Sequence, residues 1–153
     1  MLLAKNGLTV ATGGYGGIME AACRAAAEAG GTTLGVTAPT VFPDRPGANA
    51  WVQHELPADS LIQRLELLTT IASGFIALPG SLGTLAELVL AWNLAFVAPF
   101  ANTQAPPIVA VGEPWITVVP ELATRLGTDG GLVQVAANAD EAVAVVVQAV
   151  AGS

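Results

Sequence analysis

The sequence predicts an α/β fold, in which a doubly wound parallel sheet has helices on both faces. Short apolar runs alternate along the chain with segments of helical periodicity. Most of these runs are continuous, as expected for strands that are buried on both faces. Glycine-rich turns follow two of the runs, and each turn opens a helix. The chain has the length of one domain, and we expect a single domain over residues 1–153.

The predicted strands are short apolar runs that are bounded by turns, loops or glycines. Such runs are too short for a stable helix and are typical of buried strands. We expect strands at residues 8–11, 32–37, 74–78, 107–111 and 132–135.

The predicted helices lie between these strands. The first covers residues 18–29 and is closed by a pair of glycines. Ser60 and Gln63 have the spacing of a capping box, which predicts a helix from there to residue 72. The proline-rich segment 38–49 is expected to be a loop. Further helices are expected between the second glycine turn and Pro99, over residues 116–126 and over residues 138–151.

The charged residues argue against two classes of partner. The formal net charge is −7, and the five lysines and arginines are scattered along the chain. No basic stripe is present to follow a nucleic-acid polymer, and no polybasic segment is present to anchor the chain to a membrane. The longest apolar run, residues 88–100, is interrupted by Asn93 and is expected to be too short to span a bilayer.

The remaining composition bears on assembly and location. Hydrophobic residues make up 53% of the chain and charged residues 11%, so we expect apolar surface to face a second copy in a homodimer or a higher homo-oligomer. Cys23 is the only cysteine, which excludes an intrachain disulfide and favours a cytoplasmic location. His54 is the only histidine and is expected at the surface or in a loop. No metal site and no cofactor are predicted.

Two glycine-rich turns, residues 12–17 and 79–84, are the candidate phosphate-binding segments. Both follow a predicted strand, at the edge of a parallel sheet where ligands bind. Glycines let backbone N–H groups approach an anion closely, and a helix N-terminus adds partial positive charge. The alternative is that the glycines only make tight turns. Neither turn has the Gly-Lys-Ser/Thr ending of a P-loop. The residues expected to contact a nucleotide or its phosphate are Gly13, Gly14, Gly17, Met19, Pro79, Gly80, Ser81, Leu82, Gly83 and Thr84.

Arg64 and Glu87 are the candidate catalytic residues. Arg64 falls on the apolar side of its predicted helix, and no acidic residue lies four positions before or after it. An anionic ligand would satisfy this guanidinium; the alternative is an arginine at the edge of the core whose head group reaches water. Glu87 lies three residues after Thr84, which is the spacing of a capping box and also a position from which a carboxylate could reach a bound ribose.

Three segments resemble the LOG (Lonely Guy) family of Rossmann-like proteins. They are residues 12–20, Arg64 in its helix, and residues 75–87, which are similar to the family's PGGxGTxxE motif. The resemblance covers nearly the whole chain. It implies a Rossmann-like fold that lacks the family's first strand-helix unit, because few residues precede Leu8. Ser81 and Leu65 depart from the family pattern, at a motif glycine and at a lysine.

The resemblance implies a 5′-monophosphate phosphoribohydrolase, which releases a free base and ribose 5-phosphate from a nucleoside monophosphate such as AMP or a cytokinin nucleotide. By analogy Gly80, Gly83 and Thr84 would hold the phosphate, and Glu87 and Arg64 match the catalytic pair. Family members are commonly dimers. Many have carried a lysine decarboxylase label. A PLP enzyme needs a Schiff-base lysine, however, and the only lysine here precedes the first strand.

Two other functions stay open at this point. A carrier of a nucleotide or of the molybdenum cofactor would share the glycine turns and would not need catalytic residues. A structural subunit would use the turns only for its architecture. Arg64 and Glu87 favour the enzyme, whereas Ser81 and Leu65 favour the carrier.

Overall fold

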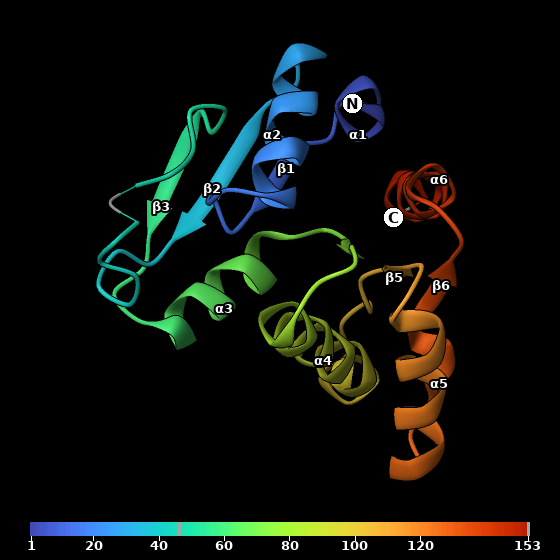
Figure 1. Ribbon diagram of the computed structural model, residues 1–153. Helices are drawn as coiled ribbons and strands as arrows, with labels where there is room; N and C mark the ends of the chain where they lie inside the picture. Colours follow the sequence, from blue (N-terminus) through green and yellow to red (C-terminus); the bar gives the residue numbers. More distant parts are fainter. Residues whose placement is uncertain (46, 153) are drawn as a thin grey trace. The chain divides into compact units, whose positions relative to one another are not determined.

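The computed structural model of the protein describes residues 1–45 and 47–152. The chain divides into two compact units, residues 1–72 and 73–153, and each unit contains a three-stranded parallel sheet (Figure 1). Helices flank both sheets, so the predicted α/β class with parallel strands is confirmed. The expectation of a single domain over residues 1–153 stays a prediction.

The first unit contains, in chain order, α1 (Leu2–Lys5), β1 (Val10–Thr12), α2 (Ile18–Glu28), β2 (Thr33–Thr37), β3 (His54–Pro57) and α3 (Leu61–Ile71). The strand order is β1-β2-β3. Val10 of β1 lies opposite Thr33 of β2, and Leu34 of β2 lies opposite His54 of β3. Helix α2 packs against β1 and β2, and α3 packs against β2 (Figure 1).

The second unit contains, in chain order, β4 (Phe75–Ala77), α4 (Leu82–Val97), the 3-10 helix η1 (Ala98–Ala101), β5 (Ile108–Val111), α5 (Trp115–Leu126), the 3-10 helix η2 (Gly130–Leu132), β6 (Gln134–Ala136) and α6 (Ala139–Ala151). The strand order is β4-β5-β6. Phe75 of β4 lies opposite Ile108 of β5, and Val109 of β5 lies opposite Gln134 of β6.

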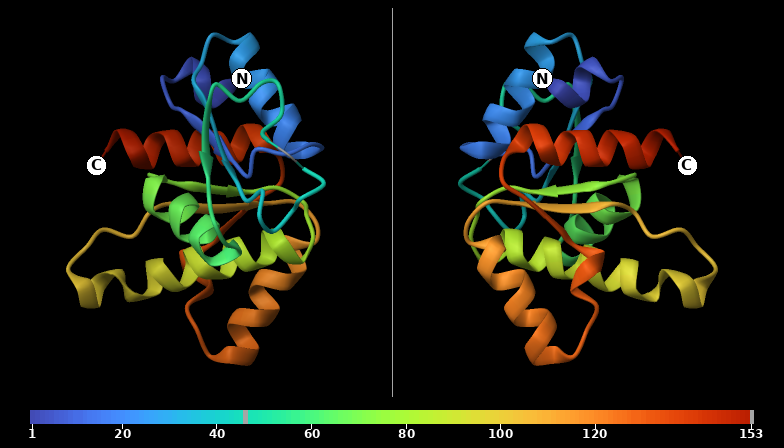
Figure 2. Two further views of the ribbon diagram at one scale, coloured as in Figure 1. Left: turned by 90° about the vertical axis from the view of Figure 1, so that its left-hand side faces the viewer. Right: turned by 90° about the vertical axis from the view of Figure 1, so that its right-hand side faces the viewer.

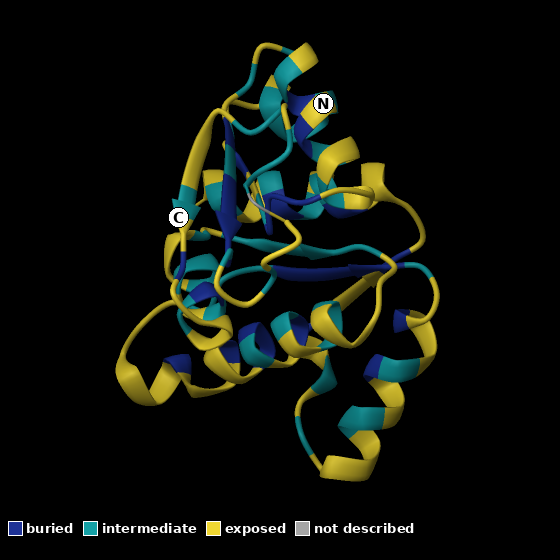
Figure 3. Cartoon of the chain, turned by 60° about the vertical axis from the view of Figure 1, so that its left-hand side comes forward, coloured by how far each residue is buried: buried dark blue, intermediate teal, exposed yellow. Residues whose placement is uncertain are grey.

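Strand β5 is central in the second unit and is buried on both faces. Ile108 and Ala110 pack with residues of α4 and α5, whereas Val109 and Val111 pack with residues of α6. Figure 2 shows α6 on one side of this sheet and α4 on the other. Figure 3 shows buried residues in the strands and on the inner sides of the helices. Continuous apolar runs therefore mark strands that are covered on both faces, as predicted.

The predicted strands are all present, with ends that shift by up to two residues. Strand β3, helix α1 and the 3-10 helices η1 and η2 were not predicted. Strand β3 is an edge strand with mostly exposed residues, so it has no apolar run by which to recognise it. His54, expected at the surface or in a loop, is the exposed first residue of this strand. The short helix α1 packs against α2.

The length argument against a membrane-spanning helix is wrong. Helix α4 begins at Leu82, before the apolar run, and together with η1 it forms a 20-residue helical segment with mean hydropathy 1.6. By length and composition this segment is sufficient to cross a membrane. Core helices of globular proteins pass the same criterion, and α4 contributes Leu88, Ala91, Trp92 and Ala95 to the core of its unit.

Candidate functional site

The first glycine turn joins β1 to α2 and uses glycine at two positions for its backbone conformation. Gly14 has φ +77° and Gly17 has φ +72°, a region that side chains rarely allow. A Cβ atom at Gly14 would also lie 2.9 Å from Cγ2 of Thr37 on the neighbouring strand. Gly17 is the N-cap of α2 and provides no side-chain hydrogen bond to the helix.

Arg64 of helix α3 is buried against this turn. Its side chain is 8% exposed; its Nε atom donates to the carbonyl oxygen of Val36 at 2.8 Å, and Nη2 donates to that of Gly13 at 3.2 Å. The guanidinium also lies 5.6 Å from the ring centroid of Tyr15. The alternative of an arginine whose head group reaches water is therefore wrong. Gly13 must lack a side chain, because a Cβ atom there would collide with Nη2 of Arg64.

Asn49 holds the next two carbonyl groups of the turn. Its Nδ2 atom donates to the carbonyl oxygens of Gly14 and Tyr15, at 3.0 and 2.9 Å, and its backbone N–H donates to Gly14 at 2.7 Å. Its Oδ1 atom accepts from the N–H of Trp51 at 3.0 Å. The proline-rich loop thus fixes the first glycine turn through the side chain and the backbone N–H of Asn49.

In the first turn the carbonyl oxygens are therefore engaged within the protein, whereas N–H groups stay available to a ligand. The carbonyl oxygens of residues 13–15 all accept hydrogen bonds from Arg64 or Asn49. The N–H groups of residues 15–17 donate to no other group in the part of the chain that the structure describes. Successive N–H groups of this kind form a nest that suits an anion.

The second glycine turn leads from β4 into α4 and has a different construction. Ser81 is the N-cap of α4 and has φ −108°, so a serine meets no backbone strain there. Gly80 and Gly83 do not have positive φ. Gly80 is needed for another reason, because an added Cβ atom would lie 2.7 Å from Cβ of Thr84.

Glu87 lies within α4 and is half-buried. The capping-box alternative for Thr84 and Glu87 is wrong, because the helix begins at Leu82 and Thr84 is already inside it. Ser81 takes the N-cap position instead. Glu87 is therefore a helical carboxylate in the second turn of α4.

The predicted site residues fall into two groups. In the first unit, Arg64 contacts Gly13, and Met19 lies beside Gly13 at the start of α2. Gly14 and Gly17 belong to the same turn. In the second unit, Glu87 follows the other turn along α4; that turn comprises Pro79, Gly80, Ser81, Leu82, Gly83 and Thr84.

An open depression of about 490 Å³ lies beside the first turn. Several residues of its lining were not predicted as site residues from the sequence. Tyr15 forms part of its wall, and its hydroxyl accepts from the N–H of Ala38 at 2.8 Å. The full lining is Tyr15, Gly16, Met19, Glu20, Arg45, Gly47, Ala48 and Asn49.

A parallel strand followed by a glycine turn and a helix is typical of a Rossmann-like protein. The chain belongs to the SLOG cluster4 family, which its residues 1–105 match. The resemblance to the LOG family is thereby confirmed.

One relative is the cytokinin riboside 5′-monophosphate phosphoribohydrolase of Mycobacterium tuberculosis. It is 33% identical over 114 residues, which are 74% of this chain and 58% of that protein. The matched part of the chain thus spans less than two thirds of this relative's length.

Two solved structures share the fold. The molybdenum cofactor binding protein of the phototrophic bacterium Rippkaea orientalis matches with a TM-score of 0.77 and 22% identity, over 97% of this chain and 82% of its own. The molybdenum cofactor carrier protein of Chlamydomonas reinhardtii matches with a TM-score of 0.66 and 28% identity, over 99% and 83% respectively. Both likenesses support the Rossmann-like fold.

Proposed function

We propose that the protein is a nucleotide N-glycosidase, which hydrolyses nucleoside 5′-monophosphates to a free base and ribose 5-phosphate. The observation that carries the proposal is the buried guanidinium of Arg64 behind the first glycine turn. Arg64 engages the carbonyl oxygen of Gly13, while the N–H groups of residues 15–17 stay available to an anion. The 33% identity with a phosphoribohydrolase supports the same activity.

The proposed chemistry assigns a separate role to each group. Water adds to C1′ of the ribose while the C1′–N bond breaks, and the base leaves with a proton. Positive charge builds on the ribose in this step, as in glycoside hydrolysis. The carboxylate of Glu87 stabilises that charge and orients the water. The N–H groups and the hydroxyl of Gly80, Gly83 and Thr84 hold the phosphate, and Arg64 keeps the first turn in shape.

Release of ribose 5-phosphate from AMP and other monophosphates tests this proposal. We expect Glu87→Gln to lower kcat by about 100-fold or more, with little change in KM. Glu66→Gln is the matched control, because Glu66 is an exposed glutamate in α3. The proposal fails if no monophosphate is hydrolysed, or if both variants are as active as the unmodified protein.

A carrier without catalysis is the second candidate function. The observation that favours it is the likeness to two proteins that are named for binding or carrying the molybdenum cofactor. Native mass spectrometry of the purified protein distinguishes the two functions. A retained phosphorylated ligand without turnover supports the carrier, and ribose 5-phosphate release excludes it.

We also propose that two copies associate through α4 and η1. These elements leave Leu94, Phe96, Val97 and Phe100 exposed, and Phe100 is 82% exposed. Such apolar surface is typical of an interface. Light scattering tests this: Phe100→Asp should lower the mass toward the 15.4 kDa of one chain, whereas Ile62→Asp, at an exposed site in α3, should not. A monomeric unmodified protein would contradict it.

The cytoplasm is the proposed location. Cys23 is free and buried, with its Sγ atom 3.3 Å from the hydroxyl of Thr12. A thiol kept reduced in the core suits a reducing compartment.

A further inference from the structure

The helical segment that α4 forms with η1 carries a regular row of exposed residues on the side away from its core. The positions of these residues are alternately four and three apart, which is the spacing by which two helices pack against each other along their length. The buried residues of α4 lie on the opposite side of the helix. The exposed row, which we call the outer stripe, consists of Leu82, Ala86, Val89, Asn93, Phe96 and Phe100.

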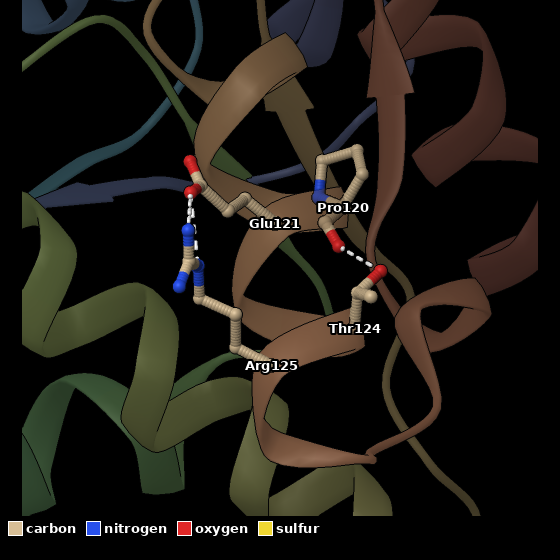
Figure 4. Close-up of polar contacts among 4 residues, drawn as sticks. All are labelled: Pro120, Glu121, Thr124 and Arg125. Carbon is tan, nitrogen blue, oxygen red and sulfur yellow. Dashed lines mark hydrogen bonds and ion pairs between the residues drawn. The ribbon is translucent and has the colours of Figure 1, made fainter.

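The outer stripe differs from an ordinary solvated helix face because it carries no charge. Glu87 is the only charged residue in the sequence of α4 and η1, and it does not belong to the stripe. The exposed face of α5 in the same unit is charged, since Arg125 pairs with Glu121 at 2.9 Å (Figure 4). Because each chain has a net charge of −7, two copies repel each other over most of their surface and approach most easily along an uncharged stripe.

Asn93 is the one polar residue of the outer stripe and lies near its middle. In the part of the chain that the structure describes, its amide group makes no hydrogen bond. A lipid surface or an apolar helix laid over the stripe would leave this donor and acceptor without partners, at a cost in free energy. A second Asn93 offers both an acceptor and a donor. A second copy of the chain is therefore the partner that the stripe fits.

We infer that two copies pair through the outer stripe as antiparallel helices, in a single register in which Asn93 of one copy meets Asn93 of the other. This inference rests on the proposed association through α4 and η1. One asparagine in an apolar helix pair fixes the register in this way. In a parallel pair Ala86 would face its own equivalent and leave space. In the antiparallel register it lies opposite Phe100 of the second copy, so a small side chain meets a large one.

The antiparallel register also brings the second copy to the second glycine turn. Helix α4 begins at Leu82, within this turn, and Ala86 directly precedes Glu87. Phe100 of the second copy, opposite Ala86, therefore lies beside the start of α4. The second copy thus adds an aromatic side chain next to the turn to which the proposed function assigns the phosphate. In a parallel pair this side chain would lie about 21 Å further along the helix.

Disulfide cross-linking of single cysteine substitutions tests the register. A disulfide needs two Cα atoms within about 7 Å. In the inferred register Asn93→Cys meets its equivalent, whereas equivalent residues at Val89 are separated by about 12 Å along the helix axis. We therefore expect about tenfold or more cross-linked dimer for Asn93→Cys than for Val89→Cys. The controls are the unmodified protein, in which Cys23 is buried, and Thr124→Cys on the exposed face of α5; neither should cross-link.

A double substitution tests the position of Phe100. A chain that carries both Ala86→Cys and Phe100→Cys should form cross-linked dimers, because each cysteine lies opposite the other type in the second copy. Either substitution alone should give none, since equivalent residues are then about 20 Å or more apart. Both positions are exposed, so neither substitution disturbs the core of the unit.

The role of Asn93 in fixing the register has a separate test. Asn93→Leu should preserve the association and allow other registers, so that Val89→Cys combined with Asn93→Leu should give about threefold or more cross-linked dimer than Val89→Cys alone. An unchanged yield would show that Asn93 does not fix the register.

The possible outcomes separate this inference from the proposals on which it rests. Cross-linking of Val89→Cys, Asn93→Cys and Phe96→Cys to equal extents indicates a parallel pair, which overturns the inference and leaves the association standing. A dimer in which Asn93→Cys does not cross-link, or the double substitution does not, also overturns it. A monomeric unmodified protein overturns the association as well. None of these measurements involves hydrolysis, so the N-glycosidase is judged separately by release of ribose 5-phosphate.

Discussion

Arg64 fixes the first glycine turn by donating from Nη2 to the carbonyl oxygen of Gly13, at 3.2 Å. Its Nε atom donates at 2.8 Å to Val36 in β2. One side chain from α3 thus joins the turn after β1 to the neighbouring strand. Because the arginine is 8% exposed, removing it would leave both carbonyl oxygens poorly accessible to water.

Arg64→Ala should therefore destabilise the first unit as well as lower activity. We expect a loss of about 1–3 kcal/mol in the free energy of unfolding, because buried acceptors lose their partners. Urea denaturation measures it. Arg125→Ala is the control, because Arg125 forms an exposed pair with Glu121 and should cost less than about 1 kcal/mol. Equal effects of the two substitutions would contradict the role of Arg64 as a buried clamp.

The two glycines of the second turn should respond differently to alanine. A Cβ atom at Gly80 would lie 2.7 Å from Cβ of Thr84, so Gly80→Ala should cost about 1–3 kcal/mol. A Cβ atom at Gly83 meets nothing within 4 Å, and Gly83 lies in α4. Gly83→Ala should therefore be neutral or stabilise by up to about 1 kcal/mol. Melting temperatures check the contrast, which fails if Gly83→Ala is the more harmful change.

The fold was predictable where burial leaves a pattern in the sequence. Strand β5 is buried at every residue and reads as a continuous apolar run. The N-cap of α3 was also recognisable, because Ser60 accepts from the N–H of Gln63 at 3.1 Å. The position of Arg64 among apolar residues indicated that its guanidinium needs a partner, and the sequence analysis expected an anionic ligand or water. Two carbonyl groups that accept from it lie 28 and 51 residues away, so no local pattern indicated them.

The remaining features depend on contacts that no local pattern encodes. Strand β3 is held by pairing with β2, and its exposed residues resemble a loop. Asn49 contacts residues 34 and 35 positions earlier, so its role follows only from the folded chain. Arg45 is oriented by Tyr15, which is distant in sequence. The helix start at Leu82 was misplaced, because Thr84 and Glu87 imitate a capping box.

Trp115 should matter for the second turn as well as for the core. It is 2% exposed, and its Nε1 atom donates at 3.0 Å to the carbonyl oxygen of Leu78, just before the turn. Trp115→Phe keeps an aromatic ring and removes this donor. We expect a loss of about 1 kcal/mol, since a part-buried acceptor loses its hydrogen-bond partner. Thermal unfolding measures it; an unchanged melting temperature would show that Leu78 does not depend on this bond.

Asn49 should control the order of the first turn. Asn49→Ala removes the donors to Gly14 and Tyr15, and Asn49→Asp places a carboxylate against the same two carbonyl oxygens. We therefore expect faster amide exchange at residues 15–17 in both variants, with the larger effect for aspartate because like charges repel.

Hydrogen exchange measured by mass spectrometry, together with nucleotide affinity, checks this prediction. Asn93→Ala is the matched control, because Asn93 is exposed on α4 in the other unit. It should leave exchange at the first turn unchanged. A loose turn should also bind nucleotide more weakly, since its N–H groups no longer converge before the ligand arrives. If Asn49→Asp exchanges as slowly as the unmodified protein, the turn is held by Arg64 alone.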